Sequence, residues 1–163
     1  MNDFALGIDI GGTNTVFGIV DHRGDIQYRG AISTKKHLKV EDYIEELYQA
    51  VLPAIEQVGG KTAIRGIGIG APNGNYYKGT IEYAPNLNWK GIVPLTEMIT
   101  EKFGLPSALT NDANAAPYII SPTAAALASL VMAQGTPNLS DINWANGTIP
   151  FHFKLGAYSI VPV

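Results

Sequence analysis

Apolar and polar residues alternate over the first part of the chain in a pattern that predicts three short strands. In Phe4–Ile10, bulky apolar side chains alternate with small or acidic ones, which is typical of a half-buried strand. Gly11-Gly12 turns the chain, and Thr15–Val20 predicts a second strand. A turn over Asp21–Asp25 precedes a third strand, Ile26–Ser33. Two successive hairpins would make these strands antiparallel.

Apolar residues next recur at helical spacing, with acidic and amide residues between them, which predicts a long amphipathic helix. Pro53 is expected to kink this helix, and Gly59-Gly60 to end it. The apolar stripe comprises Val40, Ile44, Leu47, Val51, Ile55 and Val58.

The remaining regular pattern alternates strands with helices. Ile64–Ile69 predicts a fourth strand, followed by a polar loop to about Lys90 and a short helix over Val93–Phe103. Ala108–Thr110 predicts a fifth strand, and Asn111 opens a further helix. The order β-β-β-α-β-α-β-α predicts an α/β fold with a mixed five-stranded sheet and helices on its faces. It is the order of the actin-like (ribonuclease H-like) ATPase lobe.

Composition narrows the class of protein. The chain has 163 residues, enough for one domain, and is 46% hydrophobic and 15% charged, as globular proteins are. A net charge of −3 favours neither a nucleic-acid nor a membrane partner, and the lack of cysteine excludes a disulfide or a Cys-ligated zinc site. The first residues lack a basic leader, and the longest apolar stretch, Ala124–Ala133, is too short to span a bilayer. We therefore expect a cytoplasmic protein.

The glycine turn after the first strand is the strongest local signal for chemistry. Gly11 and Gly12 let the backbone approach an anion closely, while Thr13 and Asn14 add side-chain donors. Asp9, at the carboxyl end of the strand, could hold Mg²⁺ through water. On spacing alone, an ordinary Gly-Gly hairpin with Asp9 as a turn residue explains the pattern equally well.

A second glycine-rich stretch, Gly66–Ala71, satisfies the dinucleotide pattern G-x-G-x-x-A. That motif must follow a strand and open a helix. Here the glycines lie inside the predicted strand and Pro72–Asn75 follows, so we interpret them as sites of close backbone packing. A nicotinamide site is rejected, and no P-loop motif occurs in the sequence.

Polar residues near the fifth strand suit a sugar. Asp112 follows that strand, where a carboxylate can accept a proton from an attacking hydroxyl, and Asn111 can both donate to and accept from vicinal hydroxyls. Ordinary helix capping explains both residues as well. The stretches Ala71–Asn75 and Tyr83–Trp89 are rich in amides and aromatics, which suits either carbohydrate or a long turn-rich loop.

Four segments together resemble the ROK family (repressors, uncharacterised frames and sugar kinases), particularly its bacterial glucokinases. They occur in the family's order and spacing over about two-thirds of the chain. The segments are Gly7–Asn14, Gly66–Pro72, Ala84–Leu87 before Trp89, and Leu109–Ala116.

The resemblance implies a reaction in which ATP and a hexose give ADP and hexose 6-phosphate. Asp112 would be the general base, and Asn86, Asn111 and Asp112 would bind the sugar. ROK repressors carry an N-terminal helix-turn-helix, which this chain lacks, so the expected partners are hexose and ATP rather than DNA. The residues expected to face the ATP phosphates and Mg²⁺ are Asp9, Gly11, Gly12, Thr13 and Asn14.

The family pattern ends at Ala116. We expect residues 1–116 to form the N-terminal lobe and 117–163 an atypical tail, because Pro117 interrupts the expected helix and no second glycine turn or zinc site follows. Phe151–Leu155 alternates as a late strand would. A frameshift, a deletion or a deliberately short chain would each explain a missing second lobe.

Two functional interpretations follow, with a third less favoured. The first is a truncated hexose kinase with weak or no activity, since an actin-like kinase closes two lobes around ATP. The second is a non-catalytic sugar- or nucleotide-binding remnant that could self-associate as a homo-oligomer. The third is an actin-like ATPase unrelated to sugar. His22, His37 and His152 lack metal-ligand spacing and are expected to be structural or surface residues.

Overall fold

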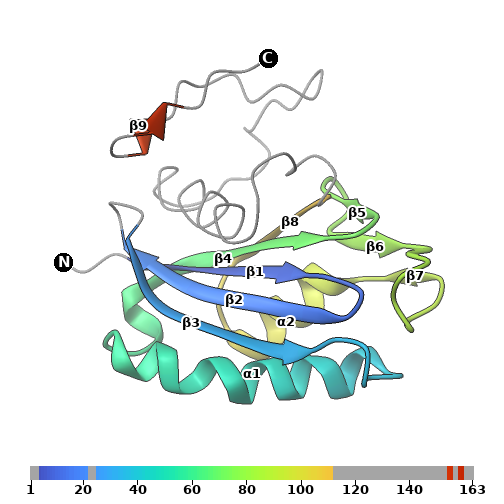
Figure 1. The fold of residues 1–163 in the computed structure, drawn as a ribbon, viewed down its shortest axis with the longest axis horizontal. Coiled ribbons are helices and arrows are strands. Elements are labelled where there is room, and N and C mark those ends of the chain that lie inside the picture. The colour runs from blue at the N-terminus through green and yellow to red at the C-terminus, as the bar shows by residue number, and fades with distance from the viewer. Residues whose placement is uncertain (1–3, 22–24, 112–153, 156–157, 160–163) are drawn as a thin grey trace.

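A computed structural model describes residues 4–21, 25–111, 154–155 and 158–159. Its main body is a five-stranded sheet with one face covered by two helices (Figure 1). The elements of this body are β1 (Phe4–Ile10), β2 (Asn14–Asp21), β3 (Ile26–Ser33), α1 (Val40–Gln57), β4 (Ile64–Ala71), α2 (Leu95–Phe103) and β8 (Ser107–Asn111), with a short 3-10 helix η1 (Lys61–Ala63) before β4.

The sheet has the order β3-β2-β1-β4-β8. The first three strands pair antiparallel, whereas β1 pairs parallel with β4 and β4 parallel with β8. The predicted actin-like fold with a mixed five-stranded sheet is therefore confirmed. The glycines of the rejected dinucleotide pattern lie inside β4, where Gly68 is level with Gly7 of β1 and Ala108 of β8.

The two faces of the sheet differ in the size of their side chains. Leu6, Ile8 and Ile10 are fully buried and belong to one apolar core with Leu47 and Ile55 of α1. The alternate positions of β1 and β4 carry mostly glycine or alanine. Because side chains alternate between faces along a strand, the bulky residues face the helices and the small residues face away from them.

Helix α1 runs unbroken through Pro53, which is exposed. It ends where predicted: the Gly60 N–H donates to Ile55 O at 2.8 Å, and Gly59 and Gly60 have φ values of 110° and 88°. Such positive φ values are natural for glycine and strained for other residues. Within the described residues, neither helix has the length and apolarity needed to cross a membrane.

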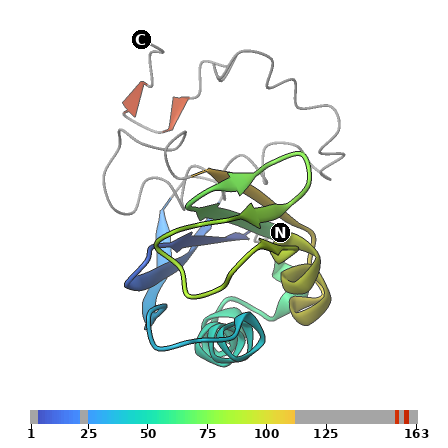
Figure 2. The same cartoon turned by 90° about the vertical axis from the view of Figure 1, so that its right-hand side faces the viewer.

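The polar segment between β4 and α2 holds a small second sheet that the sequence pattern did not predict (Figure 2). Its strands are β5 (Gly74–Asn75), β6 (Thr80–Glu82) and β7 (Ile92–Val93). The predicted helix Val93–Phe103 begins two residues later, at Leu95, because Val93 pairs with Ile81 of β6.

Most of the stretch after β8 lies outside the described residues, including the helix expected to open at Asn111-Asp112 and most of the expected late strand Phe151–Leu155. In this stretch the structure describes β9 (Lys154–Leu155), which pairs antiparallel with β10 (Tyr158–Ser159).

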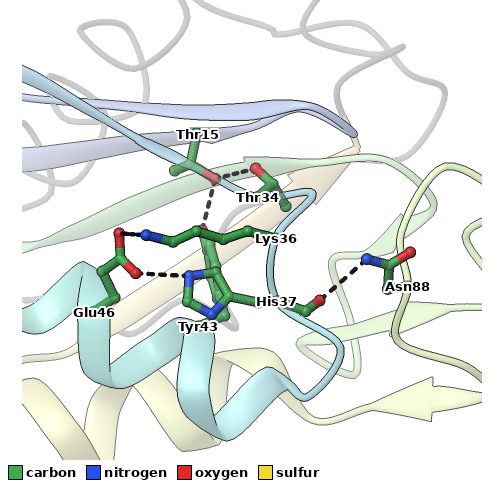
Figure 3. Close-up of polar contacts among 7 residues, drawn as sticks. All are labelled: Thr15, Thr34, Lys36, His37, Tyr43, Glu46 and Asn88. Atoms are coloured by element: carbon green, nitrogen blue, oxygen red, sulfur yellow. Dashed lines mark hydrogen bonds and ion pairs between the residues drawn. The ribbon is translucent and has the colours of Figure 1, made fainter.

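Three buried hydroxyl groups connect the sheet with α1 (Figure 3). Thr15 Oγ1 of β2 lies 2.8 Å from Thr34 Oγ1, directly after β3, and 2.9 Å from the Tyr43 hydroxyl of α1. All three residues are nearly inaccessible to solvent. Buried hydroxyls are costly unless they are paired, so this hydroxyl triad fixes how α1 sits against the β2–β3 hairpin.

We expect Tyr43→Phe to lower the free energy of unfolding by about 1 kcal/mol, because it removes one buried hydrogen bond while keeping the ring. Urea unfolding followed by circular dichroism measures the change. Tyr77→Phe is the matched control, since Tyr77 is 78% exposed. Equal stabilities of the two variants would contradict the prediction.

Candidate functional site

The parallel strands bring the predicted polar residues to one edge of the sheet. Asp9 lies one residue before the end of β1, and Asn111 is the last residue of β8. The register places Asp9 level with Gly70 of β4, which is itself level with Thr110 of β8. Two strand spacings separate Asp9 from Thr110, about 10 Å between backbones. Asp9 and Thr110 also share the face that points away from the helices.

The glycine turn between β1 and β2 presents free backbone donors. The Gly11 N–H donates to Asn14 O at 2.9 Å, which closes the turn. Within the part of the chain that the structure describes, the N–H groups of Gly12 and Thr13 make no hydrogen bond, and the Thr13 and Asn14 side chains are exposed. Adjacent free N–H groups form a concave site suited to an anion.

The segment after β3 anchors this turn. Thr13 O accepts hydrogen bonds from the Thr34 N–H at 2.9 Å and from the Lys35 N–H at 3.2 Å. Thr34 is itself fixed by the hydroxyl triad. The turn therefore has its free N–H groups on one side and a rigid attachment on the other.

Asp9 and Tyr43 sense one another electrostatically. Burial raises the pKa of Tyr43 above its ordinary value, the hydrogen bond from Thr15 opposes that rise, and the negative charge of Asp9 adds to it. Because Tyr43 lies on the helix side of the sheet, this effect places the Asp9 carboxylate within electrostatic range of the core below the turn.

The predicted sugar residue Asn86 lies against the glycine turn. A Cβ atom on Gly12 would lie 2.8 Å from Asn86 O and 3.0 Å from Asn86 Cβ. Only glycine allows so close an approach. Asn86 is exposed, and its carboxamide makes no hydrogen bond to any described residue. The structure thus brings together two stretches that are more than 70 residues apart in sequence.

The segment around Asn86 alternates buried and exposed residues. Leu87 and Trp89 are only 2% and 5% exposed, and the Trp89 ring packs on Tyr43 with ring centroids 4.6 Å apart. Trp89 is therefore part of the core rather than an aromatic surface for a sugar ring. Asn86 and Asn88 are the exposed amides of this segment.

Several predicted residues are not brought together here. Asp112, the predicted base and sugar ligand, lies outside the described residues, immediately after the last residue of β8. His22 and His152 also lie outside them. His37 is buried, with Nε2 2.9 Å from Glu46 Oε2, as a structural histidine would be. The described residues contain no cluster of three or more His, Cys, Asp or Glu side chains that could hold a metal ion.

Sequence reasoning missed the residues that hold the site together: Thr34, Tyr43 and Asn88. Each carries a polar group in a stretch that was interpreted by its apolar periodicity or loop character alone. A Tyr inside the apolar face of α1 was the available signal, because a buried hydroxyl needs a partner. The contacts of Asn88 join residues more than 50 positions apart, and one sequence without a structure gives no sign of them.

Comparison with known proteins gives consistent results. The sequence profile of the ROK family matches residues 5–128. A glucokinase of Streptomyces coelicolor is 36% identical over 114 residues, which are 69% of this chain and 34% of that protein. A putative xylose repressor of a Caldicellulosiruptor species is 35% identical over 112 residues, 68% of this chain and 28% of that protein.

A solved structure shares the fold. The ROK glucokinase of Streptomyces griseus, crystallised with glucose and AMPPNP, superposes with a TM-score of 0.56 at 33% identity. The match covers 69% of this chain and 34% of that one. The chain therefore spans about a third of the length of the relatives it matches.

We expect Gly12→Ala to displace Asn86 or the turn, because the added methyl group overlaps the Asn86 backbone. The cost should be about 1–3 kcal/mol of unfolding free energy, as for other overpacked sites. Chemical denaturation measures it, with Thr13→Ala as the control at an adjacent exposed position. A Gly12→Ala protein as stable as that control would contradict the close approach.

Proposed function

Because the chain belongs to the ROK family, we propose that it contributes the N-terminal lobe of an ATP-dependent hexose kinase. The observation that carries the proposal is the contact between Gly12 and Asn86, which sets a phosphate-type turn directly beside a free carboxamide. Phosphoryl transfer requires such proximity between the nucleotide phosphates and the sugar.

On the phosphate side, the free N–H groups of Gly12 and Thr13 suit phosphate oxygens, with the Thr13 and Asn14 side chains as further donors. Gly11 gives this turn its shape. Asp9 is the carboxylate at the base of the turn, and it would hold Mg²⁺ through water, since Mg²⁺ keeps much of its hydration shell. Mg²⁺ would supply charge neutralisation to the phosphates.

On the sugar side, Asn86 and Asn111 would bind hydroxyl groups, and Asp112 would be both a ligand and the general base. In the reaction, a sugar hydroxyl oxygen forms a bond to the γ-phosphorus, the bond from that phosphorus to the ADP oxygen breaks, and the hydroxyl proton passes to the Asp112 carboxylate. The family relation to glucokinases makes the 6-hydroxyl of a hexose the favoured acceptor.

A non-catalytic binding role is the second candidate. It is favoured by the length of the chain, about a third of that of the glucokinases it resembles. A kinase of this type encloses ATP between two lobes and excludes water. One lobe has half of that enclosure, so weak hexose or nucleotide binding with little turnover is the expected behaviour of the chain alone.

We expect Asp112→Asn to keep hexose binding while losing turnover by about 10²–10⁴-fold, because an amide cannot accept the hydroxyl proton. Isothermal titration with several hexoses measures binding, and a coupled assay of ADP release measures turnover. If wild type turns over and Asp112→Asn turns over equally fast, the assignment of the base is wrong.

We expect Asp9→Asn to weaken binding of Mg²⁺ with a non-hydrolysable ATP analogue, while hexose binding is unchanged, because the carboxylate charge is lost only on the phosphate side. Titration of the analogue with and without Mg²⁺ separates the two effects. Glu97→Gln, an exposed carboxylate on α2, is the charge-matched control. Wild-type protein that binds neither hexose nor nucleotide would refute both functional candidates.

A further inference from the structure

The carboxamide of Asn88 reaches across to a segment on the other side of the candidate site. Its Nδ2 donates to Lys35 O at 2.8 Å and to His37 O at 3.3 Å (Figure 3). Both partners are carbonyl oxygens, so the nitrogen of the carboxamide must face them. The two hydrogens of one NH₂ group thus hold two backbone carbonyls.

These two bonds continue a path to the phosphate-type turn. The segment that Asn88 holds, residues 34–37, is the one whose N–H groups at Thr34 and Lys35 donate to Thr13 O. Asn88 lies two residues after Asn86. The path therefore starts beside the predicted sugar ligand and ends in the backbone of the glycine turn.

Asn88 is exposed, but its backbone is fixed on both sides. Leu87 and Trp89 are buried, and Trp89 packs on Tyr43, which is bonded to Thr15. The apolar contacts secure the fold of the segment without Asn88. The side chain of Asn88 is then a polar brace above them, and its loss should loosen residues 34–37 without unfolding the protein.

We propose that Asn88 is a positioning residue that sets the relative placement of Asn86 and the phosphate-type turn. It acts through the carbonyl groups of Lys35 and His37 and touches neither ligand. The brace itself stands on the geometry alone, whereas its effect on sugar binding rests on the proposed hexose-kinase function.

The direct test measures amide hydrogen exchange by NMR in wild type, Asn88→Ala and Asn88→Asp. We expect exchange at Thr34 and Lys35 to quicken about fivefold in Asn88→Ala, the equivalent of roughly 1 kcal/mol. The rise should be larger in Asn88→Asp, because a carboxylate cannot donate and repels the two carbonyls. Amides of β4 should keep their wild-type rates.

Gln49→Ala is the matched control, because Gln49 is an exposed carboxamide whose bond, to Glu45 at 3.0 Å, stays within α1. Unchanged exchange at Thr34 and Lys35 in both Asn88 variants would overturn the brace. Faster exchange throughout the sheet would also overturn it, because Asn88 would then be supporting the whole fold.

Glucose titration tests the consequence for binding. We expect about fivefold weaker glucose binding in Asn88→Asp and none of this loss in Gln49→Ala. Equal glucose affinity in wild type and Asn88→Asp would overturn the positioning role. Wild type that binds no hexose would instead count against the proposed function, and the exchange rates would still decide whether Asn88 braces the turn.

Discussion

The parallel pairing of β1 with β4, and of β4 with β8, is the constraint on which the candidate site depends. Parallel strands end at the same edge of a sheet, so three stretches far apart in sequence deliver their polar residues to one place. The pairing is itself possible at this closeness because glycine and alanine occupy one face of the strands. The same small residues that mimic a dinucleotide motif therefore serve the architecture.

Above that edge, the site is held by backbone groups more than by side chains. Thr13 O, Lys35 O and His37 O are each bonded to a neighbouring segment, and Gly12 touches the backbone of Asn86. Side chains that could contact a ligand are left exposed above this framework. Such a division is suited to a site that must keep its shape while it exchanges ligands.

Much of the fold was accessible from sequence because it rests on local periodicity. The β1–β2–β3 hairpins and α1 follow directly from alternation, turn residues and helical spacing. The small sheet of β5, β6 and β7 was missed because strands of two or three residues leave no periodic signal. For the site, the turn and Asn86 were identified by family resemblance, whereas their contact depends on tertiary packing that a single sequence does not encode locally. The role of Asp112 remains a prediction.

The hydroxyl triad has a consequence for how the turn responds to its surroundings. Burial and the nearby Asp9 charge both raise the pKa of Tyr43, so its phenol keeps its proton even in mildly alkaline solution. Thr15 and Thr34 do not ionise in water at all. The fastening between α1 and the glycine turn is thus made of neutral groups, and neither acidity nor salt concentration should alter its strength.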